Sequence, residues 1–291
     1  MNDPMEAFYE VGGPADHIID TWLQQSSMRT ADLYETLAKA IESFALISFS
    51  SAHEDFPMWA YYASNFAGMC LEFDAGRLLI GELQNEQLLQ VNYARNPLPP
   101  VTLSDFASTR LPKAITSRIS RKRIEWSHEK EWRYVTGNSG KKHYLDDALR
   151  RVFLGPRISQ ANADKICQAL DRRNTEVLVA KVDGFKMLFH SIKPARPLEE
   201  CDRVGAGAFK VGEDFPVDDE IKRFLNVPIA DCIALCRQMA LQPNMEKFFG
   251  IDLNIRGDAL YIWTEYKLRN NNHVFNRRYF DKNLRVISPE S

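Results

Sequence analysis

The sequence lacks any apolar run near the roughly 18 residues that a membrane-spanning helix needs. Its N-terminal residues, MNDPMEAFYEVGG, are acidic and lack the basic and apolar regions of a secretory signal peptide. We therefore expect no membrane partner and a cytoplasmic location. An excess of one charge is also missing, because 37 basic against 39 acidic residues leave a net charge of −2. This balance gives no global attraction to nucleic acid or acidic membranes, although it allows a local patch.

Cysteine is scarce, and the five cysteines are an odd number scattered along the chain. This pattern predicts reduced thiols in a cytosolic protein rather than a disulfide framework. Cys232 and Cys236 lie one helical turn apart in an apolar stretch with too few soft ligands for a metal, so we expect buried thiols and no metal. The glycine-rich motifs of dinucleotide-binding and P-loop proteins are missing as well. A nuclease would need clustered metal carboxylates, and His53-Glu54-Asp55 is the only compact acidic group with a histidine.

The composition and length of the chain are those of an ordinary globular protein with one large domain or two modest ones. Hydrophobic residues make up 45% and charged residues 26% of the 291 positions. Periodicity predicts helices at 30–43, 57–65, 103–126 and 158–173, strands at 44–51, 69–74, 88–93, 131–137 and 150–155, and a hairpin of 176–182 and 185–192 around Asp183-Gly184. The fold class is therefore predicted to be α+β, with a mixed, mainly antiparallel sheet and flanking helices.

The pattern breaks at KPARP, and the rest of the chain differs in character. An amphipathic helix is predicted at 227–241 and a hairpin at 253–266 around Arg256-Gly257-Asp258. The Asn-rich run that follows is typical of a surface turn. We predict two domains: an α+β domain at 1–195, and a small C-terminal α/β extension at 200–291 that is an appended domain or a docking extension.

One candidate site combines hydroxyl and aromatic side chains. Ser48 and Ser50 end a predicted strand, and Trp59 and Tyr62 follow on a short helix. Donors beside flat apolar faces can hold a ring or a ribose. The alternative is that Trp59 and Tyr62 are core anchors, since residues three apart share one side of a helix.

A second candidate site is rich in charge. Glu129 and Glu131 form a carboxylate-x-carboxylate pair, with Lys122 before it and Arg133 after it. If the pair opens a strand, both carboxylates point to one face and can orient a substrate hydroxyl or stabilise a cation. The alternative is a solvated strand edge in which Glu131 is a structural partner of Arg133 or Lys122. By strand alternation, Trp132 is predicted to point into the core.

A basic stretch precedes this pair without any intervening acidic residue: Arg110, Lys113, Arg118, Arg121, Lys122 and Arg123. Such a stretch can meet phosphate, so nucleic acid is not excluded as a partner. The alternative is the solvated face of a helix.

The spacing of four blocks resembles a bacterial family known only as domain of unknown function 2971. The blocks are ISFSS, MWAYYA with GMCLEFD, K-x3-W-x2-E-x-EWR, and VFLGPRI, in that order. The leading MNDPME is similar to that family's FNDPFE turn. The resemblance covers residues 1 to about 195, lacks the family's first strands, and implies no activity.

A second resemblance is to ADP-ribosyltransferases, which hold NAD with a Ser-x-Ser/Thr strand and use a Glu of an E-x-E motif. The resemblance implies that Glu131, with Glu129 before it, stabilises an oxocarbenium ion on the ribose. It also implies that Ser48 and Ser50 orient the ribose, that Trp59 or Tyr62 stacks on nicotinamide, and that Lys122 and Arg133 contact the cofactor. Those enzymes also grip NAD with an Arg or His on an earlier strand, which this chain is expected to lack.

Two classes of function stay open from the sequence. One is an NAD-consuming, ADP-ribosyltransferase-like enzyme acting as a toxin or defence effector. The other is a non-catalytic module that binds a nucleotide, a peptide or a protein partner, because a fold does not by itself determine function.

Overall fold

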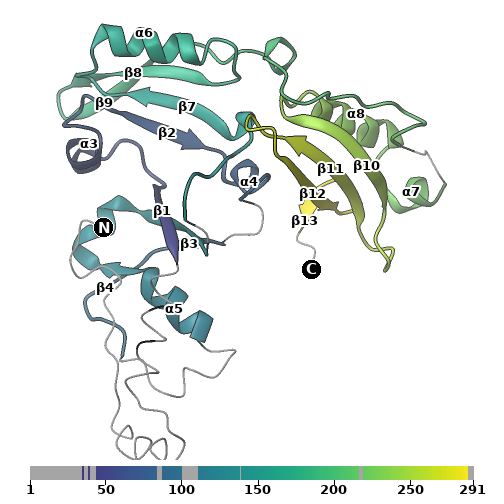
Figure 1. Ribbon diagram of the computed structural model, residues 1–291, viewed down its shortest axis with the longest axis horizontal. Coiled ribbons are helices and arrows are strands. Elements are labelled where there is room, and N and C mark those ends of the chain that lie inside the picture. The colour runs from purple at the N-terminus through teal and green to yellow at the C-terminus, as the bar shows by residue number, and fades with distance from the viewer. Residues whose placement is uncertain are drawn as a thin grey trace, which may run out of the picture. The chain divides into compact units, whose positions relative to one another are not determined.

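The computed structural model of the protein, drawn in Figure 1, describes residues 44–83, 87–99, 111–137, 139–215 and 219–287, together with Glu35 and Lys39. The chain forms two compact units: unit 1 comprises Met1–Phe56 and Glu86–Lys141, and unit 2 comprises Pro57–Asn85 and Lys142–Ser291. The MNDPME turn lies outside the described residues, as does the predicted helix 30–43 apart from Glu35 and Lys39, which are helical. The predicted boundary between residues 195 and 200 falls inside unit 2 and stays a prediction.

Unit 1 is built on a three-stranded antiparallel sheet with the order β1-β6-β3. Its strands are β1 (Ala45–Ser50), β6 (Glu131–Thr136) and β3 (Gln87–Gln90). The central strand β6 is buried along nearly its whole length, as expected for a strand with a neighbour on each side.

Beside this sheet, β4 (Asn92–Ala94) pairs in parallel with β5 (Arg121–Arg123), and α5 (Leu111–Ile119) leads into β5. The prediction that 103–126 is mostly helical is confirmed for α5 and wrong for β5. Residues 103–110, with Arg110 of the basic stretch, lie outside the described residues. A short strand and the 3₁₀ helix η2 (Ile124–Glu129) follow α5. Arginine and lysine are good helix formers, but here the pairing with β4 and the burial of Lys122 outweigh that propensity.

The first sheet of unit 2 has the order β2-β7-β8-β9, with β2 (Met69–Phe73), β7 (Leu149–Leu154), β8 (Glu176–Asp183) and β9 (Lys186–Lys193). Strands β7 and β8 are parallel and are joined by α6 (Gln160–Ala169), which covers one face of the sheet (Figure 1). The other two pairs are antiparallel. The predicted hairpin around Asp183-Gly184 is confirmed, and Gly184 has a φ of 58°, which favours glycine.

Helix α3 (Phe56–Tyr62) contributes to the core of the same unit through Trp59, which is 2% exposed. Its ring lies 6.2 Å from that of Phe189, and Phe189 meets Phe153 edge-on at 4.9 Å. Such aromatic pairs add to the stability that burial supplies. Trp59 is therefore a core anchor in this unit, whereas Tyr62 is 47% exposed.

The second sheet of unit 2 is antiparallel, with the order β10-β11-β12-β13. It consists of β10 (Met245–Leu253), β11 (Leu260–Lys267), β12 (His273–Phe280) and β13 (Val286–Ile287). Helices α7 (Asp219–Phe224) and α8 (Ile229–Ala240) share one apolar core with its inner side chains. The predicted helix 227–241 is confirmed, and the fold is α+β as predicted.

A cluster of charges joins the two sheets within unit 2. It is centred on the 3₁₀ helix η3 (Asp146–Ala148). Arg269 donates from Nε to both carboxylate oxygens of the buried Asp146 at 3.0 and 3.1 Å. The next residue, Asp147, is 1% exposed and is paired with Arg77. Because these carboxylates are buried, they depend on their arginine partners.

All five cysteines are free thiols, as predicted, and Cys232 and Cys236 are fully buried. Among the described residues, none of the helices has the length and apolar character that crossing a membrane requires.

Gly155 provides a stability test, because its backbone runs against another chain segment. It follows β7, and a Cβ added there would lie 2.1 Å from the carbonyl oxygen of Phe66 and 2.8 Å from its carbon. We expect Gly155→Ala to lower the free energy of unfolding by about 1–3 kcal/mol or more. Chemical denaturation measures this, with Gly137→Ala as the control, since a Cβ there meets no described atom within 4 Å. Equal stability of the two variants would contradict the close contact.

Candidate functional site

The charged residues singled out in the sequence meet inside unit 1. Lys122 Nζ lies 2.5 Å from Glu129 Oε2 and 3.0 Å from Glu131 Oε2. Arg133 donates to both oxygens of Glu131, from Nε at 2.9 Å and from a terminal nitrogen at 3.2 Å. All four residues are buried, with Glu131 4% and Arg133 0% exposed. We call these four residues the ion network. Two cations and two carboxylates make it formally neutral.

Burial and pairing act in opposite directions on the pKa of Lys122, whereas burial alone shifts the pKa of Arg133. Burial lowers the pKa of Lys122, but the hydrogen bonds to Glu129 and then Glu131 outweigh it, so its pKa lies above the usual value. Burial lowers the pKa of Arg133 to about 10, which leaves it charged at neutral pH. Both cations therefore keep their charge, and the network has to be paired to be tolerated in the interior.

The two carboxylates converge for a different reason from the one predicted. Glu129 ends the 3₁₀ helix η2, and only Glu131 belongs to β6. Between them, Lys130 has a left-handed backbone with a φ of 46°. The pair is therefore brought onto Lys122 by a turn rather than by strand alternation. The alternative is right in one part and wrong in the other. Glu131 pairs with Arg133 and Lys122 as it held, but the edge is not solvated, because both carboxylates are buried.

Strand β6 also corrects the prediction for Trp132. This side chain is half-buried, whereas its neighbours Glu131 and Arg133 are buried. The buried face of β6 at this position therefore carries charges, because the ion network occupies the interior where an apolar side chain was expected.

The two serines of the first candidate site lie beside the ion network, on the neighbouring strand β1. The β1–β6 register places Ser48 opposite Arg133 and Ser50 opposite Glu131, so all four side chains share one face of the sheet. The Ser50 hydroxyl donates to the carbonyl of Glu129 at 2.7 Å, whereas Ser48 is exposed. Six of the eight predicted site residues are thus in unit 1: Ser48, Ser50, Lys122, Glu129, Glu131 and Arg133.

The other two predicted residues, Trp59 and Tyr62, belong to unit 2. Their convergence with Glu131 in one cleft stays a prediction. Sequence reasoning missed Tyr93, whose hydroxyl oxygen accepts a 2.8 Å hydrogen bond from the backbone N–H of Glu131. Burial raises the pKa of this phenol, and the charges of Glu131 and Glu129 act in the same direction. Its place at the end of the predicted strand 88–93 gave no indication of this contact.

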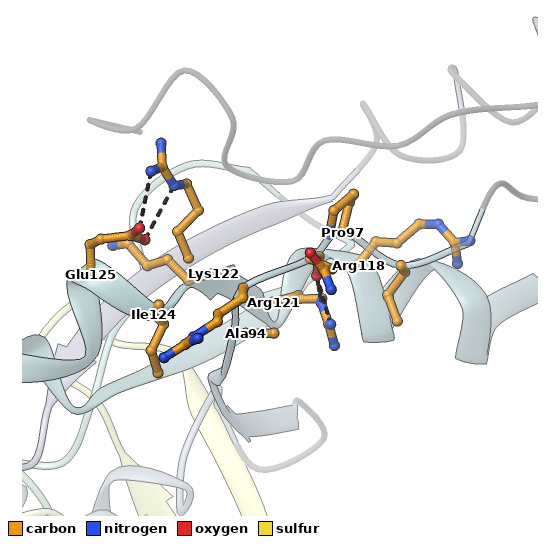
Figure 2. Close-up of a pocket in the computed structure, with 11 residues that line it drawn as sticks. Ala94, Pro97, Arg118, Arg121, Lys122, Ile124 and Glu125 are labelled. Atoms are coloured by element: carbon orange, nitrogen blue, oxygen red, sulfur yellow. Dashed lines mark hydrogen bonds and ion pairs between the residues drawn. The ribbon is translucent and has the colours of Figure 1, made fainter.

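A groove with a volume of about 600 Å³ opens next to the ion network. We call it the basic groove. It is lined by Ala94, Arg95, Asn96, Pro97, Leu98, Arg118, Arg121, Lys122, Arg123, Ile124 and Glu125. Figure 2 shows Arg118, from α5, and Arg121, from β5, on the side of the groove where Pro97 lies, with Glu125 further along. Five cations face one carboxylate in this lining, although the Lys122 ammonium is bound within the ion network.

Hydrogen bonds hold the wall of the groove in place. Arg121 donates from two nitrogens to the carbonyl of Asn96, at 3.1 and 2.7 Å, and Arg118 donates to that of Pro99 at 2.6 Å. Arg123 pairs with the exposed Glu125 and lowers the pKa of that carboxyl. The sequence did not indicate Arg95 as a candidate site residue, because the prolines of the NPLPP segment at 96–100 give no helical or strand pattern.

Comparison with known proteins agrees with the family resemblance. Residues 58–134 match the model of a family described as Protein of unknown function (DUF2971), which agrees with the predicted resemblance over these residues. The matched residues include MWAYYA, GMCLEFD and the K-x3-W-x2-E-x-EWR block, but not ISFSS, VFLGPRI or MNDPME. No curated protein and no solved structure matches the chain. Among the described residues, no three His, Cys, Asp or Glu side chains gather as a metal site would require.

The ion network predicts a large cost for removing one charge. Glu131→Gln leaves Lys122 and Arg133 without a full counter-charge in the interior. We expect the free energy of unfolding to fall by about 3–5 kcal/mol. Thermal and chemical denaturation of the purified variant measure this.

The matched control is Glu125→Gln, which changes the same atoms on a side chain that is 61% exposed. Its midpoint should remain that of the wild type, because exposed pairs contribute little. A Glu131→Gln variant that melts with the wild type would contradict a structural role for this carboxylate.

Proposed function

We propose that unit 1 is a nucleotide-binding module that holds a phosphate-bearing ligand in the basic groove. The observation that supports this most directly is the gathering of Arg95, Arg118, Arg121 and Arg123 around one cavity, with Glu125 as the sole carboxylate among the described residues that line it. One guanidinium group can bind two phosphate oxygens at once, and it stays charged at neutral pH. The whole chain is near neutral, so this concentration of positive charge is a local feature.

The size and lining of the groove favour a nucleotide over free phosphate. Its volume of about 600 Å³ lies in the range of small-molecule sites. Pro97, Leu98 and Ile124 add apolar surface to the cationic wall. A ligand with a ring and phosphates uses both kinds of surface, whereas inorganic phosphate uses only the cations.

In this proposal the ion network supports the site rather than forming it. Successive side chains of a strand point to opposite faces, so Lys122 points to the network while Arg121 and Arg123 point away from it. The bonds of Lys122 to Glu129 and Glu131 hold β5 in that orientation. The buried charge pairs behind the wall of the groove thus make it rigid.

The prediction that follows concerns Arg121 and Arg123. We expect ATP, NAD or inorganic pyrophosphate to raise the melting temperature of the wild type, because a ligand that binds only the folded state stabilises it. The variant Arg121→Gln/Arg123→Gln should lose that shift, while inorganic phosphate alone should give a smaller one in the wild type. Thermal shift and calorimetric titration measure both.

The matched control removes two positive charges elsewhere. Lys181 and Lys186 are exposed on the β8–β9 hairpin of unit 2, so Lys181→Gln/Lys186→Gln should bind as the wild type does. The proposal fails if no nucleotide binds, or if both double variants lose binding equally, since the latter would report net charge alone.

A second candidate function, NAD consumption, is favoured by the register that sets Ser48 opposite Arg133 and Ser50 opposite Glu131. In that case Glu131 would stabilise an oxocarbenium ion. Its burial and its bonds to Lys122 and Arg133 require that the network open before substrate can reach it. Release of nicotinamide from NAD by the wild type, and its loss in Glu131→Gln, would support this activity. If the wild type binds nucleotide but releases no nicotinamide, the protein is a binding module without this activity.

A further inference from the structure

The sheet formed by β10, β11 and β12 has two different faces. Leu260, Ile262 and Tyr266 of β11 point inward and share a core with α7 and α8. Alternate residues must point to the opposite side, and there β11 places Tyr261 and Trp263. The register sets Tyr279 opposite Tyr261 on the same face. This face is rich in aromatic side chains, although an outer sheet face is more often polar.

The rings on this face form two groups of contacting rings, one of Phe249, Trp263 and Phe275 and the other of Tyr261 and Tyr279. A register shift between Phe248 and Gly250 turns Phe249 outward, where its ring lies 5.1 Å from Trp263 and 5.3 Å from Phe275. Tyr261 and Tyr279 lie 6.3 Å apart. Phe249 and Phe275 are 42% and 45% exposed, so these two rings remain open to a partner, whereas Tyr261, Trp263 and Tyr279 are half-buried. We call Phe249, Tyr261, Trp263, Phe275 and Tyr279 the aromatic face.

Cations lie directly on these rings. The guanidinium of Arg277 is 4.9 Å from the centres of both Tyr261 and Trp263, and Lys247 Nζ is 4.4 Å from that of Phe249. Lys267 occupies the same side of β11 by alternation.

The acidic groups on this side are fewer. Glu265 is paired with His273 at 2.8 Å and with Lys247 at 3.6 Å, and Asp252 lies on β10 opposite Tyr261. Three lysine or arginine side chains thus lie on this side against two carboxylates. Because Lys247 is paired with Glu265, Arg277 and Lys267 are left against Asp252. The surface therefore favours an anionic ligand that also has flat faces.

We propose that the aromatic face binds single-stranded nucleic acid. Unpaired bases stack on exposed aromatic rings and on arginine guanidinium planes, and the phosphates between them need cations close by. A base-paired duplex buries its bases and offers only its backbone, so it would not use the rings. A second copy that packs the same face against this one would place like charges, such as the two Arg277 side chains, close together. This site is separate from the basic groove and does not rest on nucleotide binding there.

The test uses fluorescein-labelled oligouridylate and oligodeoxythymidylate of about 12 nucleotides, within the usual site size, and the full-length chain. Fluorescence anisotropy should detect binding of one or both strands that weakens with salt. Phe275→Ala and Phe249→Ala should each weaken it by about 5- to 150-fold, the range found for removing one stacking ring. Arg277→Gln should reduce the slope of log affinity against log salt by about 0.7, the value for one phosphate contact on a single strand.

Two matched controls make the same chemical changes elsewhere in unit 2. Phe185→Ala alters a fully exposed ring at the β8–β9 turn, and Arg237→Gln removes an exposed cation from α8, on the covered side of the sheet. Both should bind as the wild type does. Because Phe275 and Phe249 are both largely exposed, each variant is expected to fold, and circular dichroism verifies this.

Several results would overturn the proposal. These are no binding of either strand at low salt, equal binding of a duplex of the same length, and affinities unchanged by both phenylalanine variants. Loss of binding only in Arg121→Gln/Arg123→Gln would assign the strand to the basic groove instead. A dimer that Phe275→Ala dissociates, without any binding of the oligonucleotides, would assign the face to contact between copies.

Discussion

The arrangement of unit 1 depends on the burial of four charges as a neutral set. Lys122, Glu129, Glu131 and Arg133 come from β5, η2 and β6, and each is tolerated in the interior only while its partners are present. The pairing therefore ties these three elements to one another more specifically than apolar contact would. It also explains why charged side chains occupy the interior at this part of β6, and why Trp132, its most apolar residue, is only half-buried.

The same burial determines which side chains remain available for binding. With Lys122 directed inward, its neighbours on β5 are left on the groove side, where Arg121 also holds the segment that carries Arg95. Unit 2 uses charge differently: its cations Arg277 and Lys247 lie over aromatic rings on one face of a sheet. One unit thus concentrates positive charge in a cavity, and the other spreads it over an aromatic sheet surface. Both are local features of a chain with almost no net charge.

Much of the fold could be predicted from periodicity, because strands such as β1, β7 and β8 are short apolar runs and α8 has a clear amphipathic pattern. Strand β12 was missed, since both of its faces mix polar and aromatic residues and the asparagines before it resemble a plain surface turn. The candidate charged residues were found from their spacing. Their burial and mutual pairing could not be, because neither the turn at Lys130 nor the path of β5 has a sequence signature.

The interleaving of the two units has a consequence for the order in which the protein is made. The β1–β6 ladder pairs Ala45 with Thr136, and β2, α3 and the short helix α4 (Ala75–Leu78) are synthesised between the two strands. Strand β1 must therefore wait for its partner while a large part of the chain is still emerging from the ribosome. Pairings of such long sequence separation form slowly and leave a strand edge unprotected in the meantime. The nascent chain is most vulnerable to aggregation before residue 136 has emerged.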